Sequence, residues 1–294
     1  MTVLLLLALS LPCVYAAQGG DSRAALASAG ITRLCTDADL ALREPLPTPG
    51  TAPRAGVASP TRAPWIVASG WRIMRRPATK YVFDVPPGKA ALATAEVFAY
   101  GADAALKIDP ADARSLGEML KFLEALPAVE LPPVSDLAIV DDGSMITGEV
   151  MNLLARRNLL FEIVQAPSPR YRINVRIGTP EYPREEAADP NAFALKIRRQ
   201  LTDDQRTLRV FGSEVVICRL TAGSGRARLH LINYGGREID GLRIRVRGAY
   251  GNGDARVAGV GPLALQDRVV AGGATEFSLP RLTTYAVIDL QSAR

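Results

Sequence analysis

Four acidic residues are the side chains of this sequence best placed to do chemistry. Each is predicted to lie at or just beyond the carboxyl end of a short strand, which is where parallel sheets bind their ligands. Paired carboxylates at a suitable separation hydrolyse glycosides. The four candidate catalytic acids are Asp109, Asp141, Asp142 and Glu181.

The same acids also have a structural alternative. Asp141 and Asp142 precede a predicted helix and are suited to capping it, and Asp109 stands before Pro110 in a turn that leads to another helix. Acids at helix starts are ordinary, because they complement the positive end of the helix dipole. We therefore weigh capping ahead of catalysis for each of them.

The polar loop that holds the two adjacent carboxylates is the predicted ligand site. Asp141, Asp142 and Ser144 follow a strand, and the N–H groups of the next helix turn toward the same crevice. Two carboxylates disfavour an anion there and suit sugar hydroxyls or a hard cation. Trp65 and Trp71 could stack on a sugar ring, and we include Trp71 among the ligand contacts, although a large aromatic beside a strand is more often core.

The sequence lacks the catalytic residues that several enzyme classes need. An amidotransferase needs a cysteine nucleophile and a partner histidine, but the cysteines lie elsewhere and the single histidine is His230. Strand alternation puts His230 with Arg228 on the face opposite Leu229 and Leu231, so we expect an exposed or half-buried sheet histidine. Because the sequence has one histidine and no close pair of cysteines, we predict no metal site, and no zinc site in particular. No G-x-S-x-G elbow, P-loop or complete dinucleotide fingerprint occurs, and we predict no cofactor.

Residues 1–17 predict a secretory signal peptide. The apolar core from Val3 to Leu11 is too short to span a bilayer, and small residues precede a cleavage point near Ala17 or Gln18. No later stretch is long and apolar enough for a membrane span. We therefore expect a soluble, secreted or periplasmic protein with no membrane segment after cleavage.

Two cysteines remain after this cleavage, Cys35 and Cys218. Export permits a disulfide between them or with another chain. Both lie in apolar runs, however, where a buried thiol is at least as common. Both outcomes stay open.

The composition predicts a globular chain without a nucleic-acid surface. A length of 294 residues suggests two or three domains, and 48% hydrophobic residues supply a core. The formal net charge is +5, but the basic residues are scattered among acids and aromatics are only 6%. Because basic and aromatic residues are not interleaved, we predict no nucleic-acid partner.

The elements that must position the acids begin with a strand–helix–strand unit at residues 136–164. An apolar run at 137–140 predicts a strand, a helical pattern follows, and a second strand starts at Phe161. Such a unit implies a parallel sheet. A further strand and a helix capped by Asp189 complete a flavodoxin-like middle domain over residues 136–207.

Residues 18–135 predict an α/β region with about three or four strands. It holds an alanine-rich helix at 88–100 closed by Gly101 and an amphipathic helix at 113–126. The prolines of residues 45–64 predict a loop or covering strap, because proline lacks the donor that a sheet needs.

Residues 208–294 predict an antiparallel β-sandwich. Seven short strand-like runs are separated by glycine turns. In one of them, residues 242–248, apolar residues alternate with Arg243, Arg245 and Arg247, which predicts one apolar and one basic face.

This order of segments resembles the rear portion of barrel-type glycoside hydrolases, notably bacterial β-galactosidases, with an amidotransferase-like middle domain. The resemblance rests on AEVFAYGADAALKID (95–109), DLAIVDDGS with NLLARRNLLFEIV (136–164), RLHLINY (228–234) and FSLPRLTTYAVIDL (277–290). It implies that a catalytic carboxylate pair would lie in the barrel. A complete (β/α)₈ barrel takes about 200 residues or more, so the front of this chain is expected to be an incomplete barrel.

We therefore expect an α/β protein followed by an all-β domain, secreted and carbohydrate-associated, and a non-catalytic or degenerate relative of glycoside hydrolases. One alternative is an active glycoside hydrolase that uses the strand-end carboxylates. Another is a structural module that forms homo-oligomers. Carbohydrate is the expected partner in the first two cases.

Overall fold

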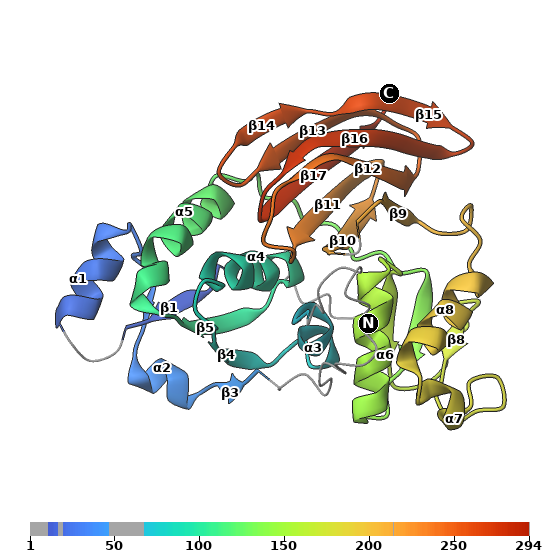
Figure 1. The fold of residues 1–294 in the computed structure, drawn as a ribbon, viewed down its shortest axis with the longest axis horizontal. Coiled ribbons are helices and arrows are strands. Elements are labelled where there is room, and N and C mark those ends of the chain that lie inside the picture. The colour runs from blue at the N-terminus through green and yellow to red at the C-terminus, as the bar shows by residue number, and fades with distance from the viewer. Residues whose placement is uncertain (1–10, 17–19, 47–67, 214, 294) are drawn as a thin grey trace. The chain divides into compact units, whose positions relative to one another are not determined.

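The computed structural model describes residues 11–16, 20–46, 68–213 and 215–293. The chain divides into two compact units (Figure 1). The first unit comprises Met1–Pro47 and Arg76–Glu130, and the second comprises Thr48–Arg75 and Leu131–Arg294. Within the described ranges, no helix has the length and apolar character to cross a membrane.

The first unit is built on a five-stranded parallel sheet of order β2-β1-β5-β4-β3. The strands are β1 (Cys13–Tyr15), β2 (Leu34–Cys35), β3 (Glu44–Pro45), β4 (Lys80–Asp84) and β5 (Asp103–Lys107). The helices are α1 (Gly20–Ser28), α2 (Asp37–Ala41), α4 (Ala90–Tyr100), the 3₁₀ turn η1 (Pro110–Asp112) and α5 (Ala113–Glu124). β5 pairs with β1, which leaves β2 and β3 as the edge strands of an open sheet.

Strand β1 lies inside the segment that we expected to be a signal peptide. Val14 is 0% exposed between β2 and β5, and Cys13 forms a disulfide with Cys35 across a Cα–Cα distance of 5.5 Å. The partner of Cys35 is thus a residue of the predicted signal peptide, which we had not considered for a disulfide. Cys218 is a buried free thiol. Cleavage near Ala17 would remove a strand from the middle of the sheet.

The helices of the first unit follow their local sequence signals. α4 ends at Gly101 in the left-handed conformation (φ 63°), as predicted. The apolar stripe of α5, which includes Leu116 and Leu123, is buried. Apart from Pro45 and Leu46, the proline-rich strap predicted at 45–64 lies outside the described residues, as does Trp65.

The second unit begins with the predicted strand–helix–strand arrangement. A three-stranded parallel sheet has the order β7-β6-β8, with β6 (Leu137–Val140), β7 (Phe161–Val164) and β8 (Asn174–Val175). Its helices are α3 (Gly70–Arg75), α6 (Met145–Arg156), α7 (Arg184–Ala187) and α8 (Pro190–Gln200). α6 connects β6 to β7 and packs against α8 (Figure 1). The side chain of Asp189 caps α8, as predicted.

The rest of the second unit forms two antiparallel sheets that share one hydrophobic core. One sheet has the order β10-β11-β17-β13-β14 and the other β15-β16-β12-β9. The strands are β9 (Leu208–Phe211), β10 (Val216–Gly223), β11 (Arg226–Asn233), β12 (Ile239–Arg247), β13 (Tyr250–Val257), β14 (Gly261–Ala264), β15 (Gln266–Ala271), β16 (Ala274–Leu282) and β17 (Tyr285–Ser292). This confirms the predicted class of parallel α/β sheets followed by an antiparallel sandwich.

A close backbone contact between two helices gives a first prediction. A Cβ atom at Gly117 on α5 would lie 2.0 Å from the carbonyl oxygen of Ala29, which follows α1. We expect Gly117→Ala to force the helices apart and to destabilise the protein by about 1–3 kcal/mol, the usual cost of overpacking. Lys121→Ala, at an exposed position of the same helix, is the control. Equal thermal unfolding temperatures for the two variants would contradict the contact.

Candidate functional site

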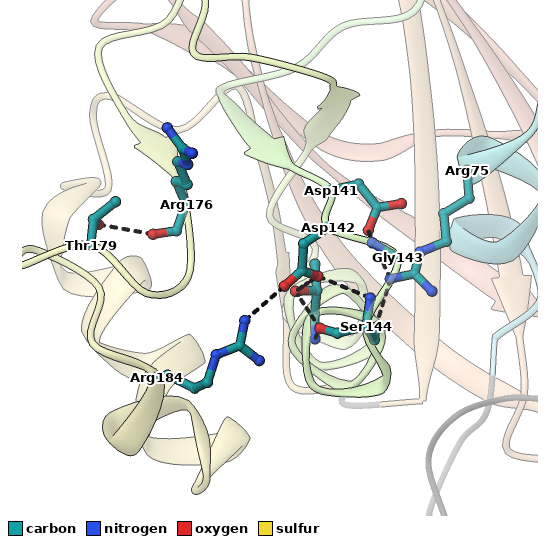
Figure 2. A network of polar contacts seen from close by, with 9 residues as sticks. Arg75, Asp141, Asp142, Gly143, Ser144, Arg176, Thr179 and Arg184 are labelled. Carbon is teal, nitrogen blue, oxygen red and sulfur yellow. Dashed lines mark hydrogen bonds and ion pairs between the residues drawn. The ribbon is translucent and has the colours of Figure 1, made fainter.

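The acidic loop after β6 is held by an arginine from another segment. The side chain of Asp141 accepts hydrogen bonds from the guanidinium of Arg75 on α3 (2.9 Å) and from the backbone N–H of Gly143 (3.0 Å). Arg75 also donates to the carbonyl oxygen of Ser144 (3.0 Å). Asp141 therefore ties α3 to the loop that leads into α6 (Figure 2).

Asp142 is the most heavily engaged acid of the loop. One carboxylate oxygen accepts from the backbone N–H of Ser144 (2.9 Å) and the hydroxyl of Thr147 (2.7 Å), and the other accepts from Arg184 on α7 (3.0 Å). Partial burial raises the pKa of Asp142, but the hydrogen bonds from Ser144, Thr147 and Arg184 outweigh it and hold this pKa well below its usual range. Figure 2 shows Arg184 and Arg75 approaching the loop from opposite sides.

Ser144 completes the start of α6 as its N-cap. Its hydroxyl oxygen accepts from the backbone N–H of Thr147 (3.3 Å). The polar groups of the loop are thus occupied by the helix and by two guanidinium groups. Ser144, and not Asp141 or Asp142, therefore caps α6, while the two acids brace the loop before it. The two guanidinium groups neutralise the charge that a hard cation would need.

Trp71 lies in the core. Its side chain is 2% exposed on α3, and a Cβ at Gly148 on α6 would come within 2.9 Å of the ring. The guanidinium of Arg75 lies 5.3 Å from the ring centroid. The ring therefore packs against α6, as in the core alternative that we weighed against sugar stacking.

The other two candidate acids, Asp109 and Glu181, contact other segments of the chain. Asp109 belongs to the first unit, where its side chain caps η1 by accepting from the N–H of Ala111 (2.9 Å). Glu181 is exposed before α7, and its backbone carbonyl accepts from Lys196 (2.8 Å). Of the four candidates, Asp141 and Asp142 share one loop, and no local sequence signal predicts their partners Arg75 and Arg184.

His230 is buried, and our expectation of an exposed or half-buried histidine was wrong. The side chain is 2% exposed, and its Nδ1 lies 2.6 Å from the hydroxyl of Tyr285. Arg228 on the same face is 0% exposed and makes two hydrogen bonds to Asp289 (2.7 and 2.8 Å). Burial, with help from the charges of Arg219 and Arg228, lowers the pKa of His230 to about 3. Asp289 and Tyr285 on β17 supply the hydrogen-bond partners that Arg228 and His230 need when they are buried.

Within the described ranges, no group of three or more histidine, cysteine or acidic side chains is placed to hold a metal ion. Asp141 and Asp142 instead accept from arginines and loop N–H groups, and Asp109 accepts from the N–H of Ala111.

Comparisons with known proteins place the chain by fold. No family model and no curated protein matches it. An α-L-fucosidase, isoenzyme 2 from Paenibacillus thiaminolyticus, is similar in structure at 10% identity and a TM-score of 0.58, over 74% of this chain and 61% of the fucosidase. A GH42 β-galactosidase from G. stearothermophilus matches at 9% identity and a TM-score of 0.47, over 77% of this chain and 57% of that enzyme. The chain thus spans less than two thirds of either enzyme's length, and the fucosidase shows that it has a glycoside hydrolase-like fold.

The loop geometry gives a second prediction. Asp142→Ala removes the acceptor for Ser144, Thr147 and Arg184, and we expect a loss of about 1–3 kcal/mol in the free energy of unfolding, because hydrogen bonds to a charged group are lost. Asp142→Asn keeps an acceptor for the loop and should lose less. Urea unfolding of both variants at neutral pH measures the difference. Equal losses would contradict this role of Asp142 as the acceptor that holds the loop, and so would a calcium-induced rise in melting temperature that Asp142→Asn abolishes.

The buried histidine gives a third prediction. In the unfolded chain His230 takes up a proton below its ordinary pKa of 6.5, whereas in the folded chain it does so only near pH 3. Its contribution to stability is therefore complete above pH 6.5 and is lost as the pH falls, by about 2 kcal/mol at pH 5.

Urea unfolding of wild type and His230→Gln at pH 7 and pH 5 tests this sign. We expect the variant to lose less stability than wild type between the two pH values. Tyr285→Phe keeps the buried histidine and should keep the wild-type pH dependence. A His230→Gln protein with the full wild-type acid sensitivity would contradict the assignment.

Proposed function

We propose that this protein is a non-catalytic, carbohydrate-associated relative of glycoside hydrolases. The observation that carries the proposal is the engagement of three of the four candidate carboxylates. Asp141 and Asp142 are paired with guanidinium groups, and Asp109 caps a turn. A side chain that serves as a cap or ion-pair partner is not free to attack or protonate a sugar.

Hydrolysis of a glycoside needs one carboxyl group that carries a proton and a second carboxylate across the scissile bond. Asp142 cannot fill the first role, because its lowered pKa keeps it ionised. Burial raises the pKa of Asp136, which would suit an acid. Asp136, however, precedes β6 at the amino end of the strand and accepts hydrogen bonds from the N–H and hydroxyl of Thr207. It therefore lies at the opposite end of the strand from Asp141.

The carbohydrate part of the proposal is supported by the fold. One solved structure that shares it is an α-L-fucosidase. We extend to this chain only the class of ligand, carbohydrate, and not the reaction. We further propose that the sheet β7-β6-β8 with its helices corresponds to the amidotransferase-like domain of such enzymes, over residues 136–207.

We also propose that the protein works in an oxidising compartment outside the cytoplasm. The disulfide between Cys13 and Cys35 supports this, because disulfides persist mainly in secreted and periplasmic proteins.

A fourth prediction tests the function. We expect the full chain to be retarded by at least one polysaccharide in affinity gel electrophoresis and to release no 4-nitrophenol from 4-nitrophenyl α-L-fucoside or β-D-galactoside. The double variant Asp141→Asn with Asp142→Asn is the matched control for residual release. Release by wild type that this variant abolishes would overturn the non-catalytic role. Absence of retardation across neutral and acidic polysaccharides would overturn the carbohydrate association.

A further inference from the structure

One face of the sheet β15-β16-β12-β9 carries a row of arginines. On β12, Leu242, Ile244 and Val246 are buried in the core between the sheets. Because side chains alternate along a strand, Arg243, Arg245 and Arg247 lie on the opposite face. The predicted division of β12 into an apolar and a basic face is therefore confirmed.

The neighbouring strand extends this row. In the register of β12 with β9, Arg243 lies opposite Phe211 and Arg245 lies opposite Arg209. Directly opposite residues share a face. We call Arg209, Phe211, Arg243, Arg245 and Arg247 the arginine face.

The spacing of the arginine face suits an extended ligand. Alternate residues of a strand are about 6.6 Å apart, so the row from Arg243 to Arg247 spans about 13 Å. The guanidinium of Arg209 lies 4.4 Å from the centroid of the Phe211 ring, so that a cation and an aromatic ring adjoin at one border of the row.

The positive charge of this face is only partly neutralised. Arg243 pairs with Glu276 (2.7 Å) and Arg209 with Asp203 (2.8 Å). Arg245 lies 3.8 Å from Asp204, whose side chain is 97% exposed. The guanidinium of Arg247 donates to the backbone carbonyl of Asp204 (3.3 Å), and its charge also acts on the carboxylate of Asp136. Arg245 also donates to the backbone carbonyl of Asp203 (3.2 Å). Because the carboxylate of Asp203 is shared between Arg209 and Arg198 (3.2 Å), the acids around this face do not neutralise it completely.

The arrangement also carries an electrostatic cost, which its ion pairs offset in part. Like charges directly opposite each other on neighbouring strands are destabilising, and Arg245 faces Arg209 in this way. A ligand that brings carboxylates or sulfates would relieve the repulsion, because arginine presents a planar fork that matches such groups.

We propose that the arginine face binds an acidic polysaccharide, one whose sugars carry carboxylate groups. This inference rests on the proposed carbohydrate-associated function and names its ligand class. Single-stranded nucleic acid is the other polyanion to consider, but its binding uses several aromatic rings on which successive bases stack. The arginine face offers one ring, Phe211.

The test is binding of the full chain to polygalacturonate, with neutral galactan and a thymidine 20-mer as comparison ligands. We expect polygalacturonate to bind more tightly than either and to weaken as salt rises from 50 to 300 mM. The variant Arg245→Gln with Arg247→Gln should weaken binding about tenfold or more, because it removes charge-assisted hydrogen bonds. The control, Arg170→Gln with Arg172→Gln, makes the same change in net charge on the loop before β8 and should change binding less than about twofold.

Each outcome decides a separate point. Equal weakening in the two double variants would overturn the arginine face as the site. Binding of galactan but not polygalacturonate would overturn the acidic ligand and leave the proposed function standing, whereas binding of neither would overturn both. Tighter binding of the thymidine 20-mer would replace polysaccharide by nucleic acid. Melting temperatures identify a variant that misfolds, in which case Arg247→Gln alone, at an exposed position, carries the test.

Discussion

The pairing of two carboxylates with two distant guanidinium groups is the constraint on which the loop after β6 depends. Arg75 stands 66 residues before Asp141, and Arg184 stands 42 residues after Asp142. Partly buried carboxylates need charged or N–H partners, because removing one partner leaves a charge without compensation. The two pairs therefore connect α3, the β6–α6 turn and α7, and they set where α6 begins. The Trp71 ring can lie against α6 because residue 148 is glycine.

The same pairing limits what these acids can do chemically. A carboxylate that accepts from a guanidinium and from N–H groups of its own loop is stabilised in its ionised form. A general acid needs the opposite environment, an apolar one that favours the protonated form. Asp142 cannot have both, and its hydrogen bonds commit it to the first. A fold of the glycoside hydrolase type can thus retain acids at strand ends whose role is to hold helices in place.

Local features were predictable from the sequence because nearby residues set them. The strand β6, the βαβ connection, the Gly101 helix end and the Asp189 cap each depend on periodicity or on a cap within a few residues. Features that need distant partners were not predictable. Arg75 and Arg184 carry no signal that assigns them to Asp141 and Asp142. Strand β1 was not predicted, because a short apolar run is typical of a signal peptide and of a buried strand alike. Since Cys13 was assigned to the signal peptide, the Cys13–Cys35 disulfide was not predicted either.

Strands β14 and β15 were not predicted, for a different reason. β14 and β15 are largely exposed, so neither shows the apolar alternation by which we identified the other strands. They lie at the edges of the two sheets, where one side of the strand has no neighbour in the sheet to demand such a pattern.

Strands β11 and β12 show why alternation alone does not locate a binding surface. Both alternate apolar with basic or polar side chains, and from sequence both predict one polar face. On β11, the neighbouring strand β17 places Asp289 opposite Arg228 and supplies Tyr285 to His230, so the polar groups satisfy one another within the sheet. On β12, the neighbouring strands place one carboxylate, Glu276, and one further arginine, Arg209, opposite Arg245. The cross-strand partners, and not the alternation, decide that β11 is neutralised from within while β12 retains positive charge for a ligand.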